Sequence, residues 1–75
     1  MVRYNIRINI GNEDRTVKFY FVHKDYQNKT EEEQQNDWQK ALDELNHIYK
    51  DYGRFATEAA VTSLFNKFKF ERTMP

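Results

Sequence analysis

The chain has 75 residues, its 12 basic and 12 acidic side chains cancel to a net charge of zero, and it contains no cysteine. These values exclude a disulfide-stapled mini-protein and a thiolate zinc finger, and 39% apolar residues argue against a disordered chain. No apolar run approaches the roughly 20 residues that span a bilayer. We therefore expect one small, soluble, cytoplasmic domain of the α+β class, covering residues 1–75.

Residues 2–22 have the pattern of a β-hairpin. Apolar and polar residues alternate without a fault over residues 2–10, which is the period of a strand with one buried face. Residues 11–14 (Gly-Asn-Glu-Asp) have the composition of a turn, and residues 16–22 are rich in β-branched and aromatic side chains.

The same alternation predicts the register of the hairpin. With a turn at 11–14 the apolar residues at the centre of the two strands face each other on one side, whereas a loop one residue longer or shorter would set them against polar residues. The predicted pairs on the buried side are Tyr4–Phe21, Ile6–Phe19 and Ile8–Val17, with Ile10 opposite Arg15 next to the turn. Those on the outer side are Arg3–Val22, Asn5–Tyr20, Arg7–Lys18 and Asn9–Thr16.

Residues 23–29 are polar and predict a connector, and residues 31–52 then predict a long amphipathic helix. Thr30 and Glu33 have the spacing of a capping box, and Gly53 stands where a left-handed residue usually ends a helix. The helix carries an apolar stripe at three- and four-residue spacing, formed by Trp38, Ala41, Leu42, Leu45, Ile48, Tyr49 and Tyr52.

This stripe is longer than a short hairpin needs as cover. Two outcomes would absorb the excess: a homodimer through helix 31–52 or docking of that helix on a partner. In the third outcome the far end is covered within the chain, by Phe55, Leu64, Phe65 and Phe68.

The last third of the chain has mixed signals. Apolar residues share one helical face over about 57–67, with Thr57 as a possible cap, and predict a second, shorter helix. Residues 68–73 alternate like a strand and predict an extended tail. Because a two-stranded ribbon is marginal in water, two outcomes are open: the tail adds a third strand to the edge of the hairpin, or the hairpin joins an oligomeric sheet.

Residues with catalytic or metal-binding patterns are scarce. The sequence has no glycine-rich phosphate loop, no cysteine nucleophile and only one serine. His47 stands at helical spacing from Asp43, Glu44 and Asp51, a weak carboxylate–imidazole pattern that is typical of a solvated helix flank. We therefore predict a protein that is not an enzyme and uses no metal and no cofactor.

The zero net charge conceals a partition along the chain. Residues 30–53 hold seven acidic and two basic side chains, whereas residues 1–29 hold six basic and three acidic ones. A negative helix surface suits a basic groove on a partner protein, including a groove that normally holds nucleic acid. The leading hypothesis is thus a small inhibitor or adaptor, and its predicted partner-binding residues are Glu31, Glu32, Glu33, Asp37 and Asp43.

The alternative hypothesis is a nucleic-acid-binding protein that uses the outer face of the hairpin. Arg7 opposite Lys18 is an unfavourable like-charge pair that would hold an anion, and Tyr20 supplies one ring for stacking. The residues of this alternative site are Arg3, Arg7, Lys18, Tyr20 and Lys24. Both surfaces also have an ordinary interpretation, as helix capping and as a solvated sheet face that resists aggregation. Either function requires that the acidic and basic groups do not neutralise each other.

Overall fold

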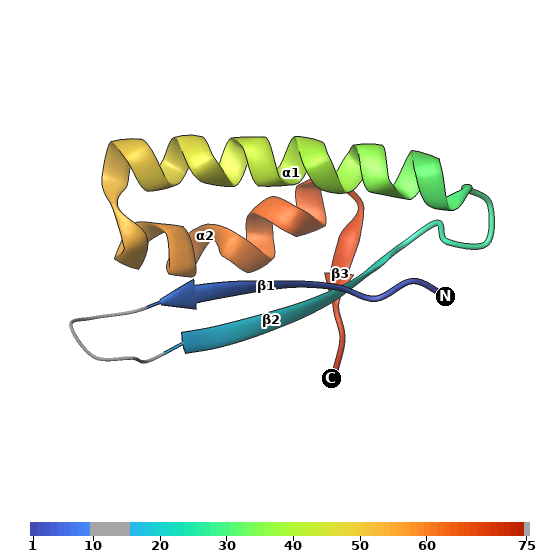
Figure 1. Ribbon diagram of the computed structural model, residues 1–75, viewed down its shortest axis with the longest axis horizontal. Coiled ribbons are helices and arrows are strands. Elements are labelled where there is room, and N and C mark those ends of the chain that lie inside the picture. Colours follow the sequence, from blue (N-terminus) through green and yellow to red (C-terminus); the bar gives the residue numbers. More distant parts are fainter. Residues whose placement is uncertain (10–15, 75) are drawn as a thin grey trace.

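The computed structural model describes residues 1–9 and 16–74, which form a three-stranded antiparallel sheet and two helices (Figure 1). The elements in chain order are β1 (Tyr4–Asn9), β2 (Thr16–His23), α1 (Glu31–Tyr52), α2 (Arg54–Lys67) and β3 (Phe70–Arg72). The strand order is β1-β2-β3, so β2 is central, and α2 contacts α1, β1 and β3. The α+β class and the order hairpin, long helix, short helix, third strand are confirmed.

The hairpin has the predicted register. Tyr4 pairs with Phe21, and the ladder continues without a slip to the pair of Asn9 and Thr16. The predicted Arg3–Val22 pair falls before the start of β1. The predicted turn and the Ile10–Arg15 pair lie outside the described residues. The tail does add a third strand, because β3 pairs antiparallel with the end of β2.

Helix α1 begins and ends at the predicted residues. Thr30 Oγ1 accepts a hydrogen bond from the Glu33 amide at 3.1 Å, and Glu33 Oε1 accepts one from the Thr30 amide at 3.0 Å, which completes the capping box. Gly53 ends the helix as predicted, and its amide donates to the Tyr49 carbonyl. Its φ of +86° is positive, but its ψ of 178° differs from the predicted left-handed helical conformation.

Helix α2 begins at Arg54, not at residue 57. Gly53 reverses the chain within a single residue, so no linker separates the two helices. Thr57 is therefore inside α2 and is not its cap: its hydroxyl donates back to the Gly53 carbonyl at 2.8 Å.

The core is largely aromatic and lies between the sheet and the two helices. The ring of Phe65 stacks on Phe21 with centroids 4.8 Å apart, and Trp38 lies 4.7 Å from Phe65. Phe70 of β3 packs edge-on against Trp38 at 5.1 Å, and Tyr4 packs against the same indole at 4.9 Å. These contacts join all five elements into one apolar cluster.

The apolar stripe of α1 is only partly covered. Trp38, Ala41 and Leu45 are buried, but Tyr52 is 75% exposed because the helix extends past the core. Leu64 and Phe65 are buried, whereas Phe55 is itself 66% exposed, so the predicted cover of the far end is incomplete. In the part of the chain that the structure describes, neither helix has the length and apolar character to cross a membrane.

Candidate functional site

The five predicted acidic residues differ in how free their carboxylates are. Glu32 and Asp43 are exposed, and Asp43 accepts a hydrogen bond from Gln39 Nε2 at 3.1 Å. Glu33 is exposed but is committed to the capping box, whose hydrogen bonds from the Thr30 backbone and hydroxyl hold the pKa of Glu33 below its usual value. Glu32 and Asp43 are therefore exposed and, among the described contacts, form no hydrogen bond or ion pair with another element.

Glu31 lies at the start of α1, near the phenol of Tyr4. Burial raises the pKa of Tyr4, and the negative charge of Glu31 raises it further. The Glu31 side chain is exposed to solvent, but its charge also influences the ionisation of the buried Tyr4 on the core side of α1.

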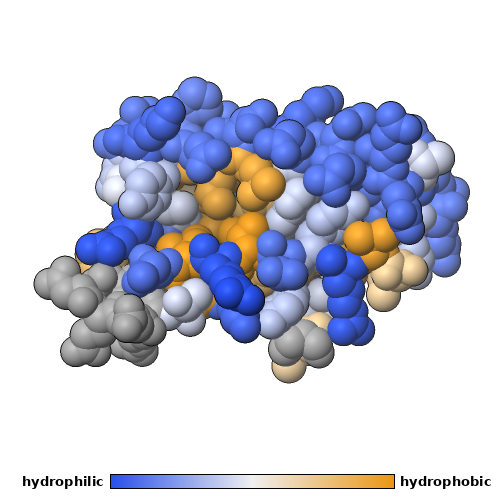
Figure 2. Space-filling model, in the orientation of Figure 1, coloured by the Kyte–Doolittle hydropathy of each residue, from blue (hydrophilic) through white to orange (hydrophobic). Residues whose placement is uncertain are grey.

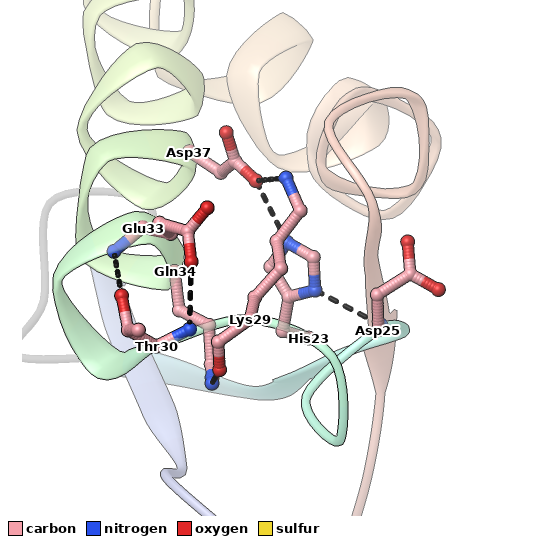
Figure 3. A network of polar contacts seen from close by, with 7 residues as sticks. All are labelled: His23, Asp25, Lys29, Thr30, Glu33, Gln34 and Asp37. Carbon is pink, nitrogen blue, oxygen red and sulfur yellow. Dashed lines mark hydrogen bonds and ion pairs between the residues drawn. The ribbon is translucent and has the colours of Figure 1, made fainter.

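Asp37 belongs to an internal network at the end of β2 (Figure 3). Its Oδ2 accepts hydrogen bonds from His23 Nε2 at 2.8 Å and from Lys29 Nζ at 3.0 Å. The Asp25 amide donates to His23 Nδ1 at 3.0 Å, so Nδ1 carries no proton and Nε2 is the nitrogen that donates to Asp37. The Asp37 carboxylate therefore ties α1 to the strand and the connector.

The electrostatics of this network favour the ionised carboxylate. Burial acts to raise the pKa of Asp37, but the hydrogen bonds from His23 and Lys29 outweigh it and the pKa is lowered. The hydrogen bond to Asp37 correspondingly raises the pKa of Lys29.

His23 is a residue that the sequence interpretation placed in a polar connector. It is the last residue of β2 and is fully buried, with its ring edge-on to Phe70 at 4.9 Å. One signal was available, because His23 is in phase with Phe19 and Phe21 on the buried side of the strand.

The solvent side of α1 carries a set of exposed carboxylates that we call the acidic face. Taken in chain order, the first two are eleven positions apart, the next two are adjacent and the last two are seven positions apart, which places all four on one broad side of the helix. The acidic face comprises Glu32, Asp43, Glu44 and Asp51, and the exposed Lys40 and Lys50 lie on the same side of the helix, so that its carboxylates exceed its ammonium groups by two. Over residues 1–9 and 16–74, the ion pair is that of Asp37 with Lys29, and the neutral His23 is hydrogen-bonded to the same carboxylate. Within these residues, no carboxylate of the acidic face forms an ion pair with a basic residue of the hairpin.

The predicted basic residues are partly brought together. Arg7 and Lys18 are exposed and directly opposite each other on β1 and β2, and Arg3 is exposed just before β1. Tyr20 is half-buried. Lys24 follows the end of β2, and its ammonium donates to Asn66 Oδ1 beside the end of α2.

The end of α1 and the start of α2 carry exposed aromatic residues, Tyr52 and Phe55, which we call the aromatic end. Their exposures are 75% and 66%, and Gly53 brings the two helix ends together. Asp51 of the acidic face directly precedes Tyr52 in α1. Carboxylates and apolar rings thus share this end of the molecule.

No group of three or more histidine, aspartate or glutamate side chains in the described ranges is arranged to hold a metal ion. Comparisons with protein-family models, with curated proteins and with solved structures find no match to the chain.

Proposed function

We propose that this protein is a non-catalytic interaction module, in which the acidic face of α1 and the aromatic end bind a basic surface of a partner protein. The observation that carries the proposal is the exposure of Tyr52 and Phe55 at the junction of the two helices, where the exposed Asp51 directly precedes Tyr52 in the chain. Solvated charges alone need no partner, but exposed apolar rings cost free energy in water and are enriched at protein interfaces.

The two parts of this surface have different roles in binding. The carboxylates steer a basic partner toward α1 and accelerate association, an effect that salt weakens. The rings of Tyr52 and Phe55 leave water in the complex and slow dissociation. The module would act as an inhibitor or adaptor in the cytoplasm by occupying a basic groove, including one that normally holds nucleic acid.

Charge reversal on the acidic face tests the proposal. The immobilised wild-type chain and the variant with Glu32→Lys, Asp43→Lys and Glu44→Lys are compared for capture of proteins from the host extract, identified by mass spectrometry. Glu71→Lys, an exposed reversal on β3, is the matched control. We expect the triple variant to lose a partner that wild type and Glu71→Lys both retain. Equal capture by all three chains would remove the acidic face from the mechanism.

The aromatic end is tested on the same captured partner. Tyr52→Ser should leave the association rate nearly unchanged and raise the dissociation rate, because the ring acts after encounter. Self-association through residues 31–52 stays a prediction of its own, and a molecular mass of one 9.2 kDa chain at all concentrations in sedimentation equilibrium would contradict it.

A second function is favoured by one specific observation, the exposed like-charge pair of Arg7 and Lys18. Such a pair costs about 0.2–1 kcal/mol in a sheet, a cost that a bound phosphate would offset. A nucleic-acid-binding role predicts that affinity for single- or double-stranded oligonucleotides falls steeply with salt. Absence of binding at low salt would exclude this role.

A further inference from the structure

A groove of about 390 Å³ lies between β1, the C-terminal half of α1 and the start of α2. Figure 2 shows an apolar hollow below the polar surface of α1. Three consecutive residues of β1, Arg7, Ile8 and Asn9, line one side of the groove. Leu45 and Tyr49 of α1 line the other, and Arg54 lies at the start of α2.

The groove runs along the free edge of β1. Successive side chains of a strand point to opposite faces, so three consecutive residues line one groove only when it borders the strand's edge. β1 pairs with β2 on one side and has no strand on the other in the described sheet. An edge of this kind presents backbone N–H and C=O groups to whatever enters the groove.

The charge of the groove selects an anionic occupant. Its charged lining residues within the described chain are Arg7 and Arg54, and neither forms an ion pair with a described acidic residue. Between them Ile8 and Leu45 are buried and apolar, and the ring of Tyr49 is 55% exposed at the rim. A small inorganic ion would leave this apolar surface and the strand edge unused.

From these observations we infer that the groove binds an extended acidic segment of a partner protein, which adds as a strand to β1. The main chain of the segment bonds to the edge of β1, its carboxylates pair with Arg7 and Arg54, and its apolar side chains cover Ile8 and Leu45. This site is independent of the acidic face, because it has the opposite charge and a different lining. The two sites together would let one module join two partner segments.

Binding of a defined peptide tests the inference by NMR of the ¹⁵N-labelled chain. The probe is the capped peptide Thr-Val-Glu-Val-Glu-Val-Thr, and its control has lysine in place of each glutamate. We expect saturable shifts of the amides of residues 7–9 and 45–54 with the acidic peptide, and at least about 10-fold weaker binding of the lysine peptide. A third peptide, N-methylated at alternate residues, should also bind about 10-fold more weakly because it cannot complete the strand ladder.

Matched variants locate the charge contact. Arg54→Gln should weaken the binding of the acidic peptide about 5- to 10-fold. Lys18→Gln removes the exposed cation opposite Arg7 but outside the groove, and should change affinity less than about 2-fold. Urea unfolding of both variants confirms that they remain folded.

Several results would overturn the inference. One is the absence of saturable shifts at residues 7–9, and another is equal weakening by Arg54→Gln and Lys18→Gln. If the N-methylated peptide binds as tightly as the acidic peptide, the strand ladder has no part in binding. If acetate causes the same shifts with the same affinity as the acidic peptide, the groove is an anion site without strand addition. A dimer that excludes the peptide from this edge would assign the groove to a second copy of the chain. None of these results affects the charge-reversal test of the acidic face, so the two proposals fail separately.

Discussion

His23 Nε2 donates a hydrogen bond of 2.8 Å to Asp37 Oδ2, which joins the end of β2 to the second turn of α1 (Figure 3). His23 is fully buried, and its second ring nitrogen accepts from the Asp25 amide. Both nitrogens of the neutral ring are therefore bonded, as a buried imidazole requires. The acidic residue that charge patterning assigned to a partner thus stabilises the fold.

Asp37→Ala should lower the free energy of unfolding by about 1–3 kcal/mol, because it leaves the buried Nε2 of His23 without an acceptor. Asp37→Asn keeps an acceptor oxygen and should lose less. Asp43→Ala removes an exposed carboxylate on the same helix and should stay within about 0.5 kcal/mol of wild type. Urea unfolding followed by the fluorescence of Trp38 measures all three. Equal losses for Asp37→Ala and Asp43→Ala would contradict a buried role for the bond.

The same carboxylate makes stability depend on pH. The folded-state pKa of Asp37 lies below its ordinary 3.8, so its contribution is present above that value and is lost as pH falls through the folded pKa. Glu33, whose pKa is also lowered, adds to this loss of stability at acid pH. The pKa of Lys29 is raised above 10.5, so its contribution is present below that value and is lost as pH rises through the folded pKa.

Asp37→Asn should therefore flatten, without abolishing, the loss of stability between about pH 5 and pH 2, because Glu33 still titrates. Urea midpoints at a series of pH values measure this loss. If Asp37→Asn loses stability with falling pH as steeply as wild type does, other groups cause this loss.

The aromatic core predicts a large contrast between two phenylalanines of α2. Phe65 is fully buried between Phe21 and Trp38, so Phe65→Ala should cost about 3–5 kcal/mol, a large share of the stability of a small domain. Phe65→Leu keeps most of the apolar volume and should cost less. Phe55→Ala, at 66% exposure, should change stability by less than about 0.5 kcal/mol. A similar loss for Phe55→Ala would mean that the aromatic end is part of the core.

The local patterns in this sequence predict its local structure well. The hairpin register follows from alternation alone, because a slip of one residue would move Ile6 and Phe19 to the solvent side. The capping box of Thr30 and the positive φ of Gly53 follow from requirements of the backbone that few residues meet. The marginal stability of a lone hairpin predicts further strand pairing, within the chain or between copies, and the structure shows the pairing within the chain.

Features that depend on residues distant in the chain could not be predicted in this way. The phase of His23 with Phe19 and Phe21 indicates its burial, but its acceptor Asp37 lies fourteen positions away, and that pairing leaves no periodic signal. The groove combines β1 with Tyr49 and Arg54, which only the packing of α1 and α2 brings to the same place. The exposure of Tyr52 likewise depends on where the core ends.

Gly53 should be the residue of the helix junction that least tolerates a side chain. Its φ of +86° and ψ of 178° belong to a region that is essentially restricted to glycine, so Gly53→Ala should cost about 1–3 kcal/mol. A Cβ placed there meets no atom within 4 Å, so the cost comes from the backbone alone. Ser63→Ala, at an exposed site within α2, is the control and should be neutral or slightly stabilising. Equal stability of Gly53→Ala and wild type would show that the junction adopts another conformation in solution.

The pair of Arg7 and Lys18 should separate stability from binding. Lys18→Glu replaces like charges directly across the hairpin by opposite ones, and should raise the free energy of unfolding by about 0.2–1 kcal/mol. Adding Arg7→Glu to this variant restores like charges and should reverse the gain. If the outer face binds nucleic acid, Lys18→Glu should also weaken oligonucleotide binding and reduce its salt dependence while the fold becomes more stable. A stabilised variant that binds oligonucleotides as wild type does would show that the like-charge pair has no part in holding phosphate.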